Sequence, residues 1–286
     1  MRVSNQLMAD KIKANIFRLS EQLVKSEERV ATGKRINRLS DDPVGIGRVL
    51  AYRKSISSMN QYTENISDGK LHIDTIENIL DTVTTFLSQA KDIAFDPSPD
   101  MRDSLAQQVA TIREQILQMA NTQINGNYVF AGDLTDTRPF DDTGVYAGDN
   151  GSKEYIIGDN IRVGLEADGS RIFQGAGNVF AVLESLQTAL ENDDVQAIED
   201  QIQPLSDAMD QIETVRVENA GLYKRLEATE THYANLTLNF QNLMSQTEDA
   251  DMAESIIDLK VQQTAYESTL AASALIINKS LLDYLG

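Results

Sequence analysis

The fold of this 286-residue chain is decided by the stretch IKANIFRLSEQLVKSEERV, residues 12–30. Apolar side chains recur in it at alternating steps of four and three residues, with Ser26 at one step: Ile12, Ile16, Leu19, Leu23 and Val30. A stripe of the same period lies at the other end of the chain: Leu270, Ala274, Ile277, Leu281 and Tyr284. Narrow apolar stripes are typical of helices that pair with other helices. We therefore expect the two ends to pair with each other or with copies of themselves.

The charges at the two ends are complementary. Residues 1–54 carry 12 Lys and Arg against 6 Asp and Glu, whereas residues 245–286 carry 2 against 7. The net charge of the whole chain is −19. A chain this acidic repels nucleic acid and anionic membranes, because binding to phosphate needs clustered basic side chains. We expect no nucleic-acid partner.

The sequence contains no cysteine, which excludes disulfides and thiolate chemistry. Its longest apolar stretch, residues 270–277, contains Ser273 and is far shorter than the ~20 residues of a membrane span. Polar residues such as Lys11, Lys13 and Arg18 break the first apolar cluster, so no cleaved signal peptide is expected. These features predict a chain that does not insert into membranes.

Helical spacing fills most of the chain. A first helix is expected over residues 4–31, ending near Gly33, and Asp42 is expected to cap a second helix that begins at Pro43. Heptad-like apolar spacing runs through residues 59–87 and again through 105–119, on either side of a turn with Pro97 and Pro99. Two antiparallel helices joined at this turn are the simplest arrangement.

The character of the sequence changes in residues 133–178, which hold 8 of the 16 glycines. Short strand-like runs occur at residues 154–157, 161–165 and 171–173, and Asp168-Gly169 is a hairpin signal. Helical spacing resumes at Phe180. No Gly or Pro lies between Gly221 and Gly286, so no break is expected before the C-terminal helix ends.

Together these patterns predict a mainly α fold: an elongated antiparallel helical bundle or coiled coil formed by the N- and C-terminal segments, with a small β-rich domain inserted in the middle. The expected domains are listed by residue range: 1–42 with 245–286 as a terminal coiled-coil assembly domain, 43–132 with 178–244 as a helical bundle, and 133–177 as the β-rich insert.

No catalytic motif is present. The two histidines, His72 and His232, lie beside the apolar stripes and are interpreted as surface or boundary residues. Residues 45–50 begin like a dinucleotide fingerprint but lack its third glycine, and no zinc-protease, Walker or nucleophile-elbow motif occurs. We predict a protein that is not an enzyme and that has no cofactor or metal site.

Two motifs resemble the bacterial flagellin family: residues 32–43, TGKRINRLSDDP, and residues 248–253, EDADMA, followed by the striped C-terminal helix. The signature positions are Thr32, Gly33, Arg35, Ile36, Asn37, Ser40, Asp41, Asp42, Pro43, Asp249, Asp251 and Met252. Within the family, residues 125–132, 215–226 and 249–254 are similar to the branch that forms the hook–filament junction, although Val217 stands where that branch more often has a small residue.

This resemblance implies a structural role in the extracellular flagellum, as an adaptor that polymerises between hook and filament. It also implies export through the flagellar export apparatus without signal cleavage, and an export chaperone bound to the C-terminal helix. The expected partners are copies of the chain, a neighbouring hook-associated protein and flagellin. The terminal stripes are then the expected assembly interface: Ile12, Ile16, Leu19 and Leu23 with Leu270, Ala274, Ile277 and Leu281.

Two alternatives remain open from the sequence. The nearest is flagellin, the filament subunit, although short flagellins tend to lack an insert with its own β signature. The more distant is a cytoplasmic coiled-coil scaffold or signalling protein, which accounts for the heptads but not for the glycine-rich insert or the matched termini.

Overall fold

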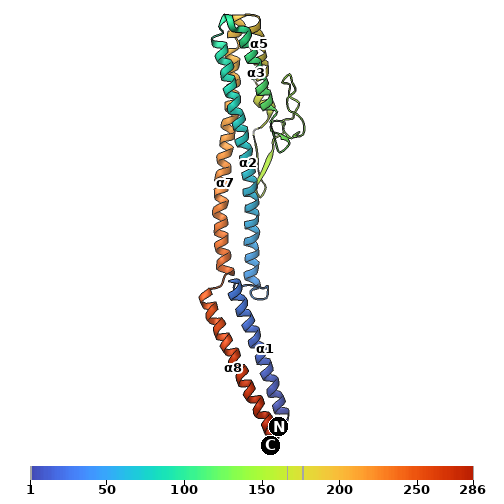
Figure 1. Ribbon diagram of the computed structural model, residues 1–286, viewed down its shortest axis with the longest axis vertical. Helices are drawn as coiled ribbons and strands as arrows, with labels where there is room; N and C mark the ends of the chain where they lie inside the picture. Colours follow the sequence, from blue (N-terminus) through green and yellow to red (C-terminus); the bar gives the residue numbers. More distant parts are fainter. Residues whose placement is uncertain (1, 166, 176, 286) are drawn as a thin grey trace. The chain divides into compact units, whose positions relative to one another are not determined.

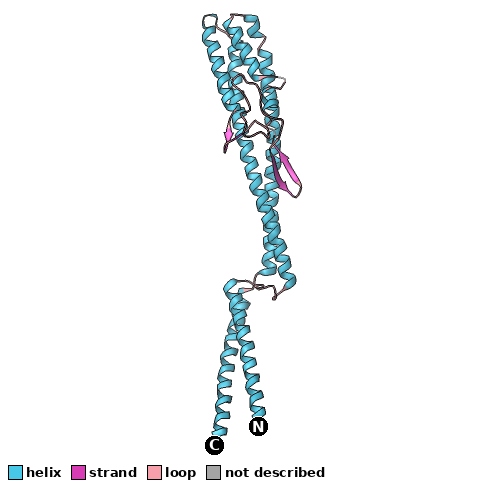
Figure 2. Cartoon of the chain, turned by 90° about the vertical axis from the view of Figure 1, so that its right-hand side faces the viewer, coloured by secondary structure: helices cyan, strands magenta, loops and turns pink. Residues whose placement is uncertain are grey.

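The computed structural model describes residues 2–165, 167–175 and 177–285, and the side chains within residues 7–274. The chain is mainly helical, with two short β-hairpins (Figures 1 and 2). The longer helices are α1 (Arg2–Thr32), α2 (Pro43–Phe95), α3 (Arg102–Ala120), α5 (Val179–Glu191), α7 (Ile202–Glu248) and α8 (Met252–Leu285). Shorter turns of helix are η1 (Pro99–Met101), α4 (Gly169–Phe173) and α6 (Val195–Glu199). The predicted mainly α fold with a small β-rich insert is confirmed.

The chain divides into two compact units. We call Met1–Ser58 with Asn235–Gly286 the terminal unit, and Met59–Ala234 the central unit. Helices α2 and α7 contribute residues to both units. The three-domain division expected from the sequence stays a prediction. In the described part of the chain, no helix combines the length and the apolar character that a membrane span needs.

Local chemistry explains where the first two helices meet. Helix α1 ends before Gly33, whose φ of +69° lies in the left-handed region that glycine adopts without strain. Helix α2 begins at Pro43, and the Asp42 carboxylate accepts a hydrogen bond of 2.8 Å from the backbone N–H of Gly45. The predicted Asp42 cap is therefore confirmed.

The core of the central unit lies among helices α2, α3, α5 and α7. Buried side chains of α2 and α3 follow the heptad-like positions read from the sequence, such as Leu80, Val83, Val109 and Ile112. The insert and the residues just before it add aromatic rings to this core: Phe130 and Phe140 each lie edge-on to Phe173, with ring centroids 5.3 Å apart. The insert is thus packed onto the helices.

Two hairpins carry the strands. Strands β1 (Gln123–Ile124) and β2 (Asn127–Tyr128) pair across Asn125-Gly126, whose φ angles are 52° and 84°. Two successive positive φ angles are typical of the tight turn favoured by Asn-Gly in hairpins. Strands β3 (Glu154–Gly158) and β4 (Ile161–Gly164) pair antiparallel, with Glu154 opposite Gly164 and an irregularity between Ile156 and Gly158. The strand-like runs at 154–157 and 161–165 are confirmed.

The expected hairpin at Asp168-Gly169 and the strand at 171–173 are wrong. Asp168 instead caps helix α4, because its carboxylate accepts hydrogen bonds from the backbone N–H groups of Ser170 and Arg171. The short helix directs the side chains of Ile172 and Phe173 toward the core, where both are buried. Aspartate is common both at helix N-termini and in turns. Here the burial of Ile172 and Phe173 in the core selects the helix.

The expectation of an unbroken helix after Gly221 is also wrong. Helix α7 ends at Glu248 and α8 begins at Met252. Asp251 caps α8, since its carboxylate accepts hydrogen bonds from Ala253 and Glu254 N–H at 2.8 and 3.2 Å. A side-chain cap and pairing with residues 33–35 replace the Gly or Pro that usually marks such a break.

Candidate functional site

Two linkers meet within the terminal unit and form what we call the corner, residues 32–43 with 248–252. The backbone N–H of Arg35 donates to the Glu248 carbonyl at 2.7 Å, and the N–H of Ala250 donates to the Gly33 carbonyl at 2.9 Å. These bonds make a short antiparallel bridge between Lys34 and Asp249. The corner therefore fastens the end of α1 to the start of α8 through the backbone.

Glu248 is the electrostatic centre of the corner. Its carboxylate lies 2.7 Å from Lys34 Nζ and 2.6 Å from Arg53 Nη2, and its side chain is only 5% exposed. Burial favours the neutral form of this carboxyl, but the hydrogen bonds from Lys34 and Arg53 outweigh burial and lower its pKa. A buried carboxylate with two cations is held charged, so the pairing joins α7, α2 and the 32–43 linker.

Capping interactions fix the path of the 32–43 linker. Burial favours the neutral form of Asp41, but hydrogen bonds from the N–H groups of Arg38 and Asn37 to its carboxylate lower its pKa. The bond from the N–H of Gly45 is the main cause of a lowered pKa for Asp42. In a turn, some backbone N–H groups have no carbonyl partner. Here the two carboxylates accept the hydrogen bonds of such N–H groups.

Close packing restricts the same linker. Ile36 is buried at the corner, and a side chain added at Gly45 would meet Ile36 Cδ1 at 2.7 Å. Gly45 therefore allows α2 to approach the linker, a reason for glycine that does not depend on a positive φ.

The structure brings the family signature together at this corner. Thr32 Oγ1 donates to Asn37 Oδ1 at 2.9 Å, and Arg35 donates to the Thr247 carbonyl at 2.8 Å. Met252 Sδ lies 4.0 Å from the position of a Cβ at Gly33. The remaining signature residues take the places described above, apart from Ser40, which is exposed.

Glu248 and its two partners, Lys34 and Arg53, are absent from the predicted site residues. Glu248 begins the 248–253 motif, but the predicted signature positions there are only Asp249, Asp251 and Met252. The basic excess of residues 1–54 was the available signal, since a single buried acid on the tail is the natural partner for two of those cations.

The terminal helices α1 and α8 run antiparallel beside each other (Figures 1 and 2). The predicted stripe on α1 lies half-buried: Ile12, Ile16, Leu19 and Leu23. Leu270 and Ala274 on α8 are exposed, whereas the side chains of Ile277 and Leu281 lie outside the described ones. The structure thus places the α1 stripe in a shallow contact.

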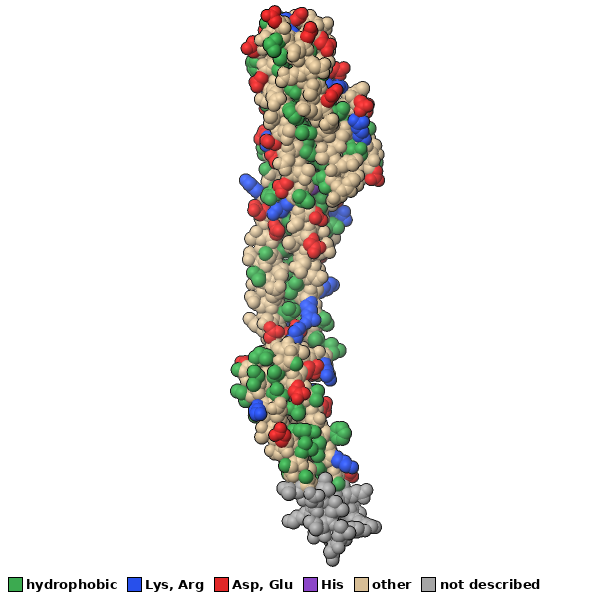
Figure 3. Space-filling model, viewed as in Figure 1, with side chains coloured by type: hydrophobic (Ala, Val, Ile, Leu, Met, Phe, Trp, Pro, Cys, Tyr) green, Lys and Arg blue, Asp and Glu red, His purple; other side chains and the backbone are tan. Residues whose placement is uncertain are grey.

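The contact between these helices lacks an apolar core. Among the described side chains of α1 and α8 the buried ones are all serines, Ser26, Ser255 and Ser273. Large apolar side chains remain exposed instead, and Figure 3 shows hydrophobic atoms on the surface of this unit. The exposed side chains include Leu7, Met8, Phe17, Val24, Ile256, Ile257 and Val261. An open hollow of about 570 Å³ lies beside Phe17 and Val24.

Comparison with known proteins gives a consistent likeness. The bacterial flagellin N-terminal helical region matches residues 3–135, which includes the whole 32–43 motif. The chain is therefore similar to bacterial flagellins in its N-terminal part. It is 28% identical to flagellar hook-associated protein 3 of Escherichia coli, over 95% of this chain and 96% of the relative. It is 26% identical to a flagellin of Halalkalibacterium halodurans, over 82% of this chain and 80% of the relative.

A solved structure shares the fold of this chain over most of its length. The structure of a putative flagellar hook-associated protein from Vibrio parahaemolyticus superposes with a TM-score of 0.68 at 20% identity. The match covers 73% of this chain and all of the other. The fold of the matched part is therefore shared at low sequence identity.

Proposed function

We propose that the chain is a structural component of the bacterial flagellum that polymerises between hook and filament and acts there as an adaptor. Likeness to hook-associated protein 3 over nearly the full length of both chains supports this role over that of flagellin, whose match covers less of the chain. Its neighbours in the flagellum are a hook-associated protein on one side and flagellin on the other.

One structural observation carries the assembly part of this proposal. Helices α1 and α8 leave large apolar side chains exposed and bury no apolar side chain within residues 7–32 and 252–274. Exposed apolar surface of this extent marks an interaction surface. Copies of the chain cover it on assembly, and the stripe of Ile12, Ile16, Leu19 and Leu23 with Leu270, Ala274, Ile277 and Leu281 takes part in the contact.

The corner has a supporting role in the same assembly. Its signature residues set the path by which α1 and α8 leave the rest of the chain, so they orient the surface that copies must match. A repeated head-to-tail contact that does not close on itself then produces a helical array.

The same likeness supports a route to the flagellum. The chain leaves the cell through the flagellar export apparatus without signal cleavage, with a chaperone on the C-terminal helix until export. The exposed apolar side chains of α8 support this step, because they need cover in the cytoplasm as well as in the assembled flagellum.

Deleting the gene tests the proposed role directly. Cells that lack the chain should carry bare hooks in electron micrographs and should shed flagellin into the medium, and a plasmid copy of the gene should restore filaments. Intact filaments on the deletion strain exclude the junction role. Bare hooks with no flagellin made or shed identify the chain as the filament subunit instead.

A further inference from the structure

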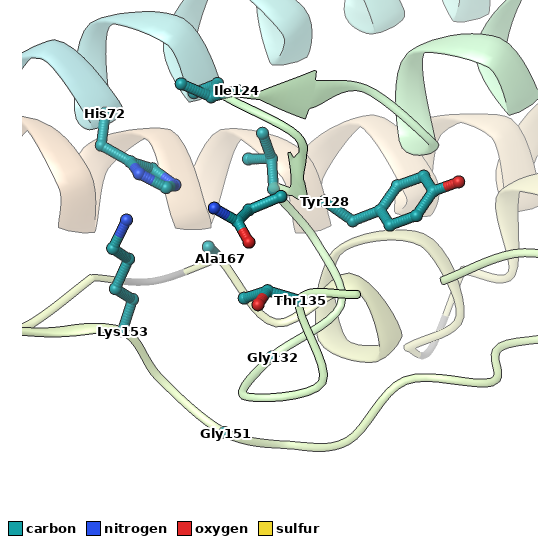
Figure 4. A pocket seen from close by; sticks show the side chains of 10 residues that line it. His72, Ile124, Tyr128, Gly132, Thr135, Gly151, Lys153 and Ala167 are labelled. Carbon is teal, nitrogen blue, oxygen red and sulfur yellow. The ribbon is translucent and has the colours of Figure 1, made fainter. Parts of the chain in front are cut away.

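A small cavity lies within the central unit, between helix α2 and the β-rich insert. Its volume is about 20 Å³. Its lining includes the polar side chains of His72 on one side and of Thr135 and Lys153 on the other, with Asn127. Figure 4 shows the His72 ring and the Lys153 side chain pointing toward one another, whereas the Tyr128 ring points away. Apolar side chains such as Ile124 and Val129 complete the lining, and no carboxylate is found among the described residues that line it.

His72 is the residue that makes this cavity informative. It is 9% exposed, and its Nε2 is fully buried and meets no hydrogen-bond partner in the described part of the chain. Its other ring nitrogen, Nδ1, lies 3.4 Å from Tyr155 Oη. Native proteins rarely leave a buried polar atom unpaired, so a group other than the chain itself is expected at Nε2.

The size and chemistry of the cavity select that group. A single buried water fits a cavity of at least ~10–15 Å³ on this measure and needs two to four polar partners. We propose that the cavity binds one water molecule, held by His72 Nε2 on α2 and by polar groups of the insert. Water both donates and accepts, so it satisfies Nε2 whichever ring nitrogen carries the proton.

Other ligands fit the same site less well. Burial and the neighbouring Lys153 lower the pKa of His72 to about 4, so the imidazole is neutral at pH 7 and gives an anion no charge. Lys153 is largely exposed, so its ammonium is already solvated. A metal cation would lie beside this same ammonium, and the described lining residues offer no carboxylate to balance it. A neutral ligand of one heavy atom is left.

Such a water adds a bridging hydrogen-bond contact between the insert and α2. Two direct hydrogen bonds already fasten strand β3 to the helices, from Tyr233 Oη to the Ile157 carbonyl at 2.6 Å and from Asn65 Nδ2 to the Ile156 carbonyl at 2.7 Å. The water adds a polar contact just before the start of β3, where Lys153 lines the cavity. This inference is independent of the role in the flagellum.

Oxygen-17 magnetic relaxation dispersion counts long-lived water molecules and can test the site on the full-length chain. The native chain is compared with His72→Phe, which keeps a ring but removes Nε2. The matched control is His232→Phe, which changes an exposed histidine of the same unit. We expect the dispersion amplitude to fall by one water in His72→Phe and to stay unchanged in His232→Phe.

An amplitude that His72→Phe leaves unchanged overturns the proposal. If that variant does not fold, the native chain decides: a water cross-peak to the His72 ring protons in rotating-frame Overhauser spectra supports the site, and its absence overturns it. Crystals of the native chain grown with sodium bromide give a separate check. An anomalous bromide peak within hydrogen-bond distance of His72 Nε2 replaces the water with an anion and also overturns the proposal.

Discussion

The central unit and the α1/α8 helix pair are built from the same kind of sequence but reach different degrees of burial. Heptad-like stripes on α2 and α3 lead into a core that includes the rings of Phe130, Phe140 and Phe173. The stripe on α1 stays half-buried, and the described side chains of α1 and α8 bury only serines. Apolar periodicity therefore indicates that a helix pairs, but not whether one chain supplies all of its partners.

The difference matters for stability, because full burial of a large apolar side chain contributes roughly 1.5–3 kcal/mol relative to leaving it exposed. The central unit buries many large apolar side chains, and each of them makes such a contribution. The α1/α8 pair gains little of it within one chain; in the proposed assembly, neighbouring copies supply the remainder. We therefore expect changes to the central unit to alter the folding of the monomer, and changes to the terminal helices to alter assembly.

The largest effect is expected from a core truncation. Phe173→Ala removes a ring that is fully buried against Phe130 and Phe140, and should lower the free energy of unfolding by about 3–5 kcal/mol. Phe17→Ala is the matched control, because Phe17 is 79% exposed, and should change it by less than about 0.5 kcal/mol. Urea unfolding followed by circular dichroism measures both. Equal losses would remove the contrast between the two regions.

A pH effect of intermediate size is expected from His72. Its pKa falls from 6.5 to about 4 on folding, through burial first and Lys153 second. Between these values the unfolded chain binds a proton that the folded chain does not, so stability falls as pH drops from 6.5 toward 4. The loss should reach at most about 3 kcal/mol.

Urea unfolding at pH 7 and pH 4.5 measures this effect in the native chain and in His72→Phe. The variant should lose less stability between the two pH values, since the carboxylates titrate in both proteins and cancel in the comparison. An identical pH dependence in both proteins contradicts the burial of a neutral histidine.

Glu248→Gln should have a smaller effect, about 1–2 kcal/mol. The change leaves Lys34 and Arg53 without their carboxylate, but these side chains are 39% and 48% exposed and water can solvate them. Because the pKa of Glu248 is lowered on folding, its contribution is present above pH 4.5 and is lost as pH falls through the folded value. Native and variant should therefore converge in acid.

Chemical unfolding at pH 7 and at pH 3 checks the change at Glu248. Glu254→Gln provides the control, since Glu254 is an exposed acid on the neighbouring helix α8. A loss as large in the control as in Glu248→Gln would show that net charge matters, rather than the pairing at the corner.

The smallest effect on the monomer is expected from Phe17→Asp. It should leave the free energy of unfolding within about 0.5 kcal/mol of native but should prevent filaments from attaching to hooks when it replaces the native gene. Gln22→Asp introduces the same charge at an exposed polar position of α1 and should retain filaments. Electron microscopy of the two strains measures the difference. Filaments in the Phe17→Asp strain place the assembly surface elsewhere.

Sequence reasoning succeeded where one local signal acts alone. Asp42 before Pro43 predicts a helix start and produces one, and the apolar spacing of residues 59–87 and 105–119 predicts the buried faces of α2 and α3. It failed at Asp168, where the same residue type serves both turns and helix caps. The burial of Ile172 and Phe173 decides that choice, and this requires knowledge of the tertiary core.

The corner shows a second kind of limit. The motifs of residues 32–43 and 248–253 were both visible, and the structure brings them together, but the pairing of Glu248 with Arg53 joins positions 195 residues apart. No local pattern specifies which of several acids is buried with which cations. The break at residues 249–251 was missed for a related reason, because a side-chain cap and a cross-chain bridge need no Gly or Pro.

The bridge between Lys34 and Asp249 also raises the effective concentration of α1 and α8 relative to each other. It holds the end of α1 and the start of α8 side by side, so these two helices meet as tethered partners and not as free segments. Short tethers give local concentrations in the millimolar range, which makes even a weak helix pair re-form after it opens. A shallow contact is then sufficient to keep α1 and α8 together, and it remains weak enough for the helices to exchange that contact for one with a neighbour.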